Sequence, residues 1–212
     1  ANLKLTRSTG EALAETQLTI PQLVKGATWN LEQLPEGDHI LSVIIRSGNS
    51  AFVLPSMTVS RIKGLNRRLE QLKDAAVTLK TATRSTTAQA SDATVASTLR
   101  DETRLIENVI EGLPQEADFP LLYRLQSSEA MLANHSEQTG FANQWSGANE
   151  VWLTLAKGIR SVPTRIHLPK KTNKPVPVLF VFHGAGGSEN MFFETYGAGR
   201  VVDEAAQRGW IV

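Results

Sequence analysis

The chain contains no cysteine among its 212 residues, and this absence excludes several kinds of chemistry. Without thiols it can form no disulfide framework, supply no thiol nucleophile and build no cysteine-based zinc site. The histidines do not replace cysteine as metal ligands, because none lies four residues from another and the His-Glu-x-x-His motif does not occur. We therefore expect neither a metal site nor a cofactor. The four histidines are His39, His135, His167 and His183.

Long apolar runs and an excess of charge are also missing. No stretch approaches the roughly 20 apolar residues that span a bilayer, and no signal-type apolar segment occurs. The formal net charge is only +1 and the basic residues are scattered, so we expect neither nucleic acid nor a membrane as a partner. The chain opens with Ala1 in place of Met, which fits a mature exported protein as well as a tag remnant. We expect an exported protein, periplasmic or extracellular.

Hydrophobic residues make up 41% of the chain and charged residues 20%, which is ordinary for one or two globular domains. Residues 1–62 are typical of short strands. His39–Arg46 is rich in β-branched residues, and Ala51–Leu54 and Met57–Ile62 are further strand-like pieces between turn residues. The phrase Leu34–His39 resembles the strand-to-strand turn of immunoglobulin-like sandwiches, although 62 residues is short for one. We therefore expect a small β-rich module here.

From Gly64 the hydrophobic period changes from two to about 3.6 residues, which predicts an amphipathic helix. The Ser/Thr/Ala tract Thr81–Ser91 is predicted to be a loop, with Ser91 or Asp92 as the N-cap of a second helix that stops near Gly112. A third helix follows. We expect a helical segment over residues 63–135 whose apolar faces pack on one another or on the following domain. The stripe of the first helix is Leu65, Leu69, Leu72, Ala76 and Leu79.

Residues 136–149 are polar and contain two glycines, so we expect a linker there. Residues 150–212 follow a different pattern. Val151–Leu155 and Thr164–Leu168 are predicted strands, and the apolar run Pro177–Phe182 is typical of a parallel strand buried on both faces. A glycine-rich turn, a helix-like segment and a final Trp-Ile-Val then complete a strand–turn–helix–strand pattern.

The glycine-rich turn, His183–Ser188, would present unpaired N–H groups at the start of a helix, where an anion is favoured. A dinucleotide-binding fingerprint fits poorly, because Glu189 stands where the third glycine is required. A phosphate-binding P-loop would need Gly-Lys-Ser/Thr, which is absent. A generic strand-to-helix turn with tolerant glycines stays open. We interpret His183 as a packing and hydrogen-bonding residue rather than a base.

The sequence His183-Gly-Ala-Gly-Gly187, directly after an apolar strand, resembles the oxyanion-hole motif of α/β-hydrolases, on the loop joining the third strand to the first helix. The neighbouring Arg165–Pro169 and the last ten residues also resemble esterases of the polyhydroxybutyrate-depolymerase and feruloyl-esterase type. The similarity covers about residues 150–212. It implies that the backbone N–H of Ala185 donates to the oxyanion, while three glycines shape the turn. These glycines are Gly184, Gly186 and Gly187.

In that family the catalytic serine lies on a Gly-x-Ser-x-Gly elbow further along the chain, followed by the acid and the histidine. No such elbow occurs here, so we expect the triad to lie after Val212 and these residues to be inactive without the remaining part of the hydrolase domain. The expected fold is multidomain: a β-rich module at 1–62, a helical segment at 63–135, a linker at 136–149 and the start of an α/β-hydrolase core at 150–212.

The resemblance implies serine-dependent hydrolysis of carboxylic esters, with polymeric esters among the candidate substrates. Two alternatives remain. One is a peptidase like prolyl oligopeptidase, because those enzymes share the catalytic fold. The other is a non-catalytic polymer-binding or partner-binding protein in which the hydrolase segment is vestigial.

Overall fold

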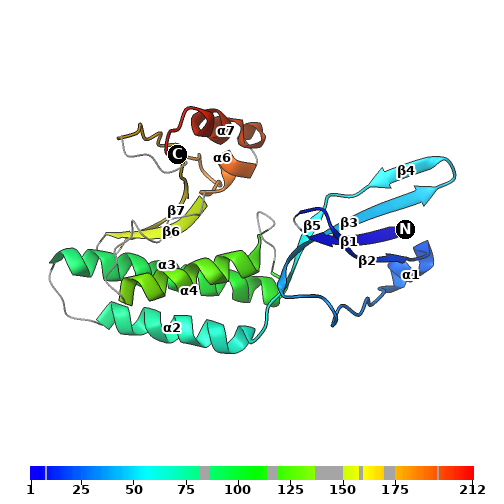
Figure 1. The fold of residues 1–212 in the computed structure, drawn as a ribbon, viewed down its shortest axis with the longest axis horizontal. Helices are drawn as coiled ribbons and strands as arrows, with labels where there is room; N and C mark the ends of the chain where they lie inside the picture. Colours follow the sequence, from blue (N-terminus) through cyan, green and yellow to red (C-terminus); the bar gives the residue numbers. More distant parts are fainter. Residues whose placement is uncertain are drawn as a thin grey trace. The chain divides into compact units, whose positions relative to one another are not determined.

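The computed structural model describes residues 1–7, 9–81, 86–113, 119–136, 150–157, 160–169, 175–194 and 196–212. It shows helices together with antiparallel sheets, which confirms the expectation of a mixed chain with more than one compact part (Figure 1). The first unit comprises Ala1–Leu65 and Asp118–Tyr123, and the second unit comprises Asn66–Ala117 and Arg124–Val212.

The strands of the first unit form one antiparallel sheet in the order β2-β1-β3-β4. The first half of β3 pairs with β5 and its second half pairs with β4, so one long strand organises the sheet. The strand-like pieces that the sequence predicts after residue 38 are confirmed as β3, β4 and β5. The elements are β1 (Asn2–Arg7), β2 (Ala12–Gln17), α1 (Ile20–Lys25), β3 (Gly37–Ser47), β4 (Ser50–Val53) and β5 (Met57–Arg61).

The core of the first unit is small, and polar contacts complete it. Among the described residues, its buried apolar side chains are Leu5 of β1, Leu34 before β3 and Leu122, and the imidazole of His39 lies 3.0 Å from the carbonyl of Pro35. Asp38, at the start of β3, accepts hydrogen bonds from two backbone N–H groups in the first turn of α4 (Leu121–Ser136). A carboxylate at a helix N-terminus satisfies donors that have no partner inside the helix.

Helices α2 (Leu65–Thr81), α3 (Thr86–Ile110) and the rest of α4 belong to the second unit. The predicted stripe is confirmed, since Leu69, Leu72 and Ala76 of α2 are buried. Ion pairs join α2 to both other helices: Arg68 lies 2.6 Å from Glu129 of α4, and Lys73 lies 2.5 Å from Glu107 of α3. Hydrogen bonds to Glu107 and then to Glu70 raise the pKa of Lys73 above its ordinary value.

The start of α3 differs from the prediction. Residues 86–91, expected to be a loop, are helical, so neither Ser91 nor Asp92 is the N-cap. Asp92 is buried inside the helix, and its Oδ1 lies 2.7 Å from Nε2 of His135 on α4. A buried carboxylate needs a partner, and this one is 43 residues away by numbering (135 − 92), beyond the reach of local sequence patterns.

Strands β6 (Glu150–Lys157) and β7 (Arg160–His167) form an antiparallel hairpin where the sequence predicts two strands. The hairpin packs on α3, because the N–H of Thr154 donates to Oγ1 of Thr98 at 2.8 Å and its hydroxyl donates to Asp101 at 2.9 Å. Residues 137–149 of the predicted linker lie outside the described residues. Among the helices that the structure describes, none is long and apolar enough to cross a membrane.

Two further segments extend this hairpin by backbone pairing. His167 exchanges two hydrogen bonds with Val212, at 2.8 and 3.2 Å. Ile211 in turn forms a parallel bridge with Val178, through hydrogen bonds to Pro177 and Leu179. The spatial order is therefore β6, β7, residues 211–212 and residues 177–179. Between the last two segments in sequence lie α6 (Met191–Glu194), the 3₁₀ turn η1 (Tyr196–Gly199) and α7 (Arg200–Gln207).

The apolar run 177–182 is buried on one face only, so the expectation of a strand buried on both faces is wrong for this structure. Leu179 and Val181 pack on the cluster of Val202, Ala205 and Val212. Val178, Phe180 and Phe182 alternate with them and are 50, 75 and 83% exposed. The alternation is that of an extended strand, but only Val178 bridges a neighbour, and the second face is open in the described part of the chain.

Candidate functional site

The candidate site is the turn that follows the apolar run, His183–Ser188. The N–H of Gly187 donates to the carbonyl of Gly184 at 3.1 Å, which closes a four-residue turn with Ala185 and Gly186 at its centre. Gly186 has φ +81°, the value that the third residue of a type II turn requires. The structure thus brings the four residues singled out by the sequence, from Gly184 to Gly187, into one turn.

The turn presents free backbone donors. Within the described part of the chain, the N–H groups of Gly184, Ala185 and Gly186 make no hydrogen bond, and all three residues are exposed. Successive N–H groups in a turn form a concavity that suits an anion or a carbonyl oxygen that becomes negative. Donor groups that the chain itself does not satisfy are available to a ligand.

The glycines differ in how strictly the geometry requires them. A Cβ at Gly187 would lie 2.9 Å from Cβ of His183, closer than side chains tolerate, whereas a Cβ at Gly184 would meet nothing within 4 Å. Gly186 is required by its φ. His183 itself is exposed, and its Nδ1–H donates to the carbonyl of Gly184 at 2.8 Å, so its ring braces the turn it begins.

The helix after the turn is shorter than the sequence predicts. The apolar spacing suggested one helix-like segment, but it is divided into α6, η1 and α7, and α6 has only four residues. Gly197 and Gly199 have φ +63° and +80°, which interrupts the helical path. A four-residue helix has only a small dipole, so the donor groups of the turn, not a helix dipole, are the feature that would attract negative charge.

The turn is anchored by a residue that sequence reasoning missed. Asn190 is buried, its N–H donates to the hydroxyl of Ser188 at 3.2 Å, and its side chain contacts Trp152 and Arg165 of the hairpin. Trp152 lies on β6 and Arg165 lies on β7. No periodic pattern marks Asn190, and its partners lie 25 and 38 residues earlier in the chain.

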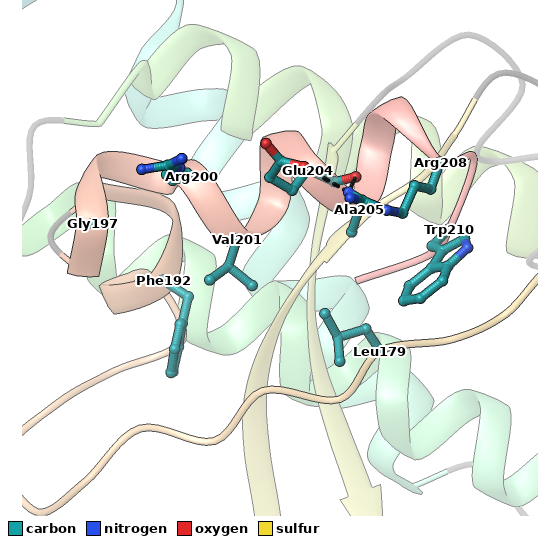
Figure 2. Close-up of a pocket in the computed structure, with 9 residues that line it drawn as sticks. All are labelled: Leu179, Phe192, Gly197, Arg200, Val201, Glu204, Ala205, Arg208 and Trp210. Carbon is teal, nitrogen blue, oxygen red and sulfur yellow. Dashed lines mark hydrogen bonds and ion pairs between the residues drawn. The ribbon is translucent and has the colours of Figure 1, made fainter.

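A separate apolar groove lies beside α7 (Figure 2). Its volume is about 690 Å³, and no residue of the turn His183–Ser188 lines it. Its rim carries an ion pair, Arg208 Nη1 to Glu204 Oε2 at 2.6 Å. Leu179 of the run 177–182 and Ala205 of α7 both line the groove, and Leu179 also packs on the apolar cluster that contains Ala205. The groove therefore belongs to the packing of α7. The lining residues are Leu179, Phe192, Gly197, Arg200, Val201, Glu204, Ala205, Arg208 and Trp210.

The described residues contain no group of three or more His, Asp or Glu side chains that could hold a metal ion. Comparisons with protein-family models, with curated proteins and with solved structures found no match to this chain. The functional interpretation therefore rests on the motif and on the geometry of the turn.

Proposed function

We propose that this chain supplies the oxyanion turn of an α/β-hydrolase that hydrolyses carboxylic esters through a serine nucleophile. The observation that carries the proposal is the turn closed between Gly184 and Gly187, in which three successive N–H groups make no hydrogen bond to the described part of the chain. Ala185 is the proposed donor to the oxyanion. Gly184, Gly186 and Gly187 shape the turn around it.

The order of the strands supports the proposal. The resemblance to α/β-hydrolases requires the oxyanion loop to follow the third strand, and β6, β7 and the run 177–182 are the first three extended segments of this part of the chain. The parallel bridge between Val178 and Ile211 is typical of a strand–helix–strand unit. Ligands of α/β sheets bind beyond the carboxyl ends of the strands, where this turn lies.

The reaction that suits such a turn is acyl transfer to water. A serine hydroxyl would attack the ester carbonyl carbon, the π electrons would move to the oxygen, and the serine proton would pass to a histidine. Collapse breaks the ester C–O bond and returns that proton to the leaving alcohol; water then hydrolyses the acyl-enzyme by the same steps. The N–H of Ala185 and a second N–H beside the serine would stabilise the oxyanion in both halves.

The nucleophile and its base are not part of the proposal for these residues. No Gly-x-Ser-x-Gly elbow occurs in the sequence, so the triad would come from the remaining part of the hydrolase domain. The immunoglobulin-like interpretation of the first unit likewise stays a prediction. Such a sandwich has about seven strands in two sheets, whereas the described residues of the first unit contain one sheet.

The test uses the protein expressed from its complete reading frame. We expect it to hydrolyse p-nitrophenyl butyrate and to react with a fluorophosphonate at one serine, which mass spectrometry of the digest would locate on a Gly-x-Ser-x-Gly elbow. A matched p-nitroanilide peptide separates the two enzymatic candidates: faster turnover of the peptide would favour the peptidase. Absence of both hydrolysis and serine labelling in a folded sample would refute the enzyme and favour the non-catalytic binding protein.

A further inference from the structure

The side chain of Asn190 connects the candidate turn to the β6–β7 hairpin. Asn190 is 3% exposed, and its Oδ1 accepts from Trp152 Nε1 at 3.2 Å and from Arg165 Nη1 at 3.3 Å. The two donors come from different strands, so the amide oxygen is held from two directions. A buried amide oxygen that lost these partners would carry the cost of an unsatisfied acceptor.

Arg165 is itself firmly held. Its Nε and Nη2 donate to Oε2 of Glu150 at 3.1 and 2.6 Å, and its side chain is 9% exposed. Its guanidinium also lies 4.5 Å from the ring centroid of Trp152 and 4.1 Å from that of Phe193. A planar cation close to two aromatic rings has little freedom, since its contacts with both rings are favourable. Arg165 therefore presents its donor to Asn190 from a fixed position.

Side chains of α3 and α4 also hold Trp152. Arg124 of α4 lies 4.7 Å from the ring centroid of Trp152. Glu102 of α3 binds Arg124 through two hydrogen bonds, at 2.7 and 2.5 Å, and both side chains are buried. A bidentate pair of this kind fixes the orientation of the guanidinium as well as its place. The helical segment thus holds the tryptophan whose N–H binds Asn190.

On the other side, Asn190 continues directly into the backbone of the turn. Its N–H donates to the hydroxyl of Ser188, and the N–H of Met191 donates to the carbonyl of Ser188 at 3.2 Å. Phe193, whose ring covers Arg165, donates its N–H to the carbonyl of Asn190. Both the side chain and the backbone of Asn190 are therefore fixed, and the end of the turn with them.

We propose that Asn190 is a positioning residue: held by Trp152 and Arg165, it fixes the end of the oxyanion turn against the hairpin. Placement of an oxyanion donor matters on the scale of about 1 Å, because a misplaced donor no longer points at the developing charge. The catalytic meaning of this anchor rests on the proposed function. The anchor itself concerns only the folded turn and can be tested without turnover.

The first measurement is hydrogen–deuterium exchange resolved to single amides in the full-length protein. Gly187 and Met191 are the reporters, because the N–H of Gly187 is hydrogen-bonded within the turn and the N–H of Met191 donates to Ser188 at its end. Asn190→Ala should speed their exchange by about tenfold or more, since a buried hydrogen-bonded acceptor is lost. Asn190→Asp keeps an acceptor for both donors and should restore exchange to within about twofold of the wild type. Asn190→Leu, which is close to asparagine in volume but has no acceptor, should exchange as fast as Asn190→Ala, whereas a role in packing alone would be rescued by it.

The matched control is Arg68→Ala. Arg68 also binds a glutamate through two hydrogen bonds in the second unit, but it belongs to a different contact, with Glu129. Arg68→Ala should leave the exchange rates of the Gly187 and Met191 amides unchanged. Should Asn190→Ala unfold the protein, Trp152→Phe replaces it, because phenylalanine keeps an aromatic ring, although a smaller one, and removes the Nε1–H donor. Unchanged exchange at Gly187 and Met191 in whichever folded variant is measured would overturn the anchor.

The second measurement separates this proposal from the proposed function. With p-nitrophenyl butyrate as substrate, Asn190→Ala should lower kcat by about tenfold or more with little change in KM, and Asn190→Asp should restore it. If the wild type hydrolyses no ester but Asn190→Ala still exchanges faster than the wild type at the turn, the result would support the anchor and contradict the hydrolase. Active protein with unchanged exchange and unchanged kcat in Asn190→Ala would contradict the anchor alone.

Discussion

At the scale of single residues, Ala185 lies where its N–H can be removed with little change to the backbone. It is the second residue of a turn whose third residue, Gly186, has φ +81°, and proline is common at that second position. We expect Ala185→Pro to lower kcat for p-nitrophenyl butyrate by about 10²–10³ with little change in KM, the range for loss of one oxyanion donor. Steady-state kinetics on the full-length protein measures it.

The control for that variant is Ala185→Gly, which retains the N–H and should keep kcat close to that of the wild type. Both variants must melt at the wild-type temperature for the comparison to hold. A wild-type kcat in Ala185→Pro would show that Ala185 is not the donor. The N–H groups of Gly184 and Gly186 would then be the remaining candidates.

Gly199 and Gly209 offer a matched pair of glycines for a second prediction. Their φ values are +80° and +72°, so an alanine at either is strained by about 1–2 kcal/mol. Only at Gly199 would the new Cβ also meet a backbone atom, the carbonyl oxygen of Phe193 at 2.8 Å. We expect Gly199→Ala to lower the free energy of unfolding by more than Gly209→Ala, as chemical denaturation would measure. Equal losses would show that the contact relaxes freely.

Residue identity revealed only part of the candidate site. Gly184 to Gly187 could be singled out because a glycine-rich motif directly after an apolar run resembles a known oxyanion-hole motif. The structure places these residues in one turn. Asn190, Trp152 and Arg165 could not be found in this way. These residues contact one another although Asn190 is 25 to 38 positions from its partners in the chain. A single asparagine forms no periodic pattern from which such contacts could be predicted.

At the scale of elements, the apolar stripe of α2 supports a third prediction. Leu72 is 1% exposed and Val77, on the same helix, is 65% exposed. Leu72→Asp should lower the free energy of unfolding by several kcal/mol, because it removes a buried side chain and buries a charge without a partner. Val77→Asp is the control and should stay within about 0.5 kcal/mol of the wild type. Similar denaturation midpoints for both variants would mean that the stripe does not form the core.

Elements with a clear period were predictable, and elements that depend on distant partners were not. The stripe of α2 and the β-branched run of β3 have a period that one segment shows alone. The prediction for the start of α3 was wrong because Ser, Thr and Asp favour N-caps locally, whereas the carboxylate of Asp92 lies inside the bundle, 2.7 Å from Nε2 of His135. The run 177–182 has the composition of a buried strand, but burial depends on neighbours that its own sequence cannot supply.

At the scale of the whole molecule, long-range contacts decide which residues form a unit. The first turn of α4 belongs to the first unit because Asp38 and Ser60, from β3 and β5, accept its N–H groups. These contacts join residues 61 to 85 positions apart. A linear reading of the chain assigns each stretch to one module, so it cannot show that a helix begins in one unit and continues in the other.

The two units should also differ in which core residues protect them. Leu5 is fully buried in the first unit and Leu99 is fully buried in the second. A unit with its own core can open by itself. Leu5→Ala should therefore lower the free energy of opening of amides in β1 and β3 by about 2–5 kcal/mol and leave α3 unchanged. Leu99→Ala should lower it by the same amount in α3 and leave β1 and β3 unchanged. Native-state hydrogen exchange at low denaturant concentrations measures both. Val24→Ala, at an exposed position of α1, should change neither set of amides. If either leucine variant lowered protection equally in β1, β3 and α3, the chain would open as one cooperative structure, and the division into two units would describe its contacts but not its stability.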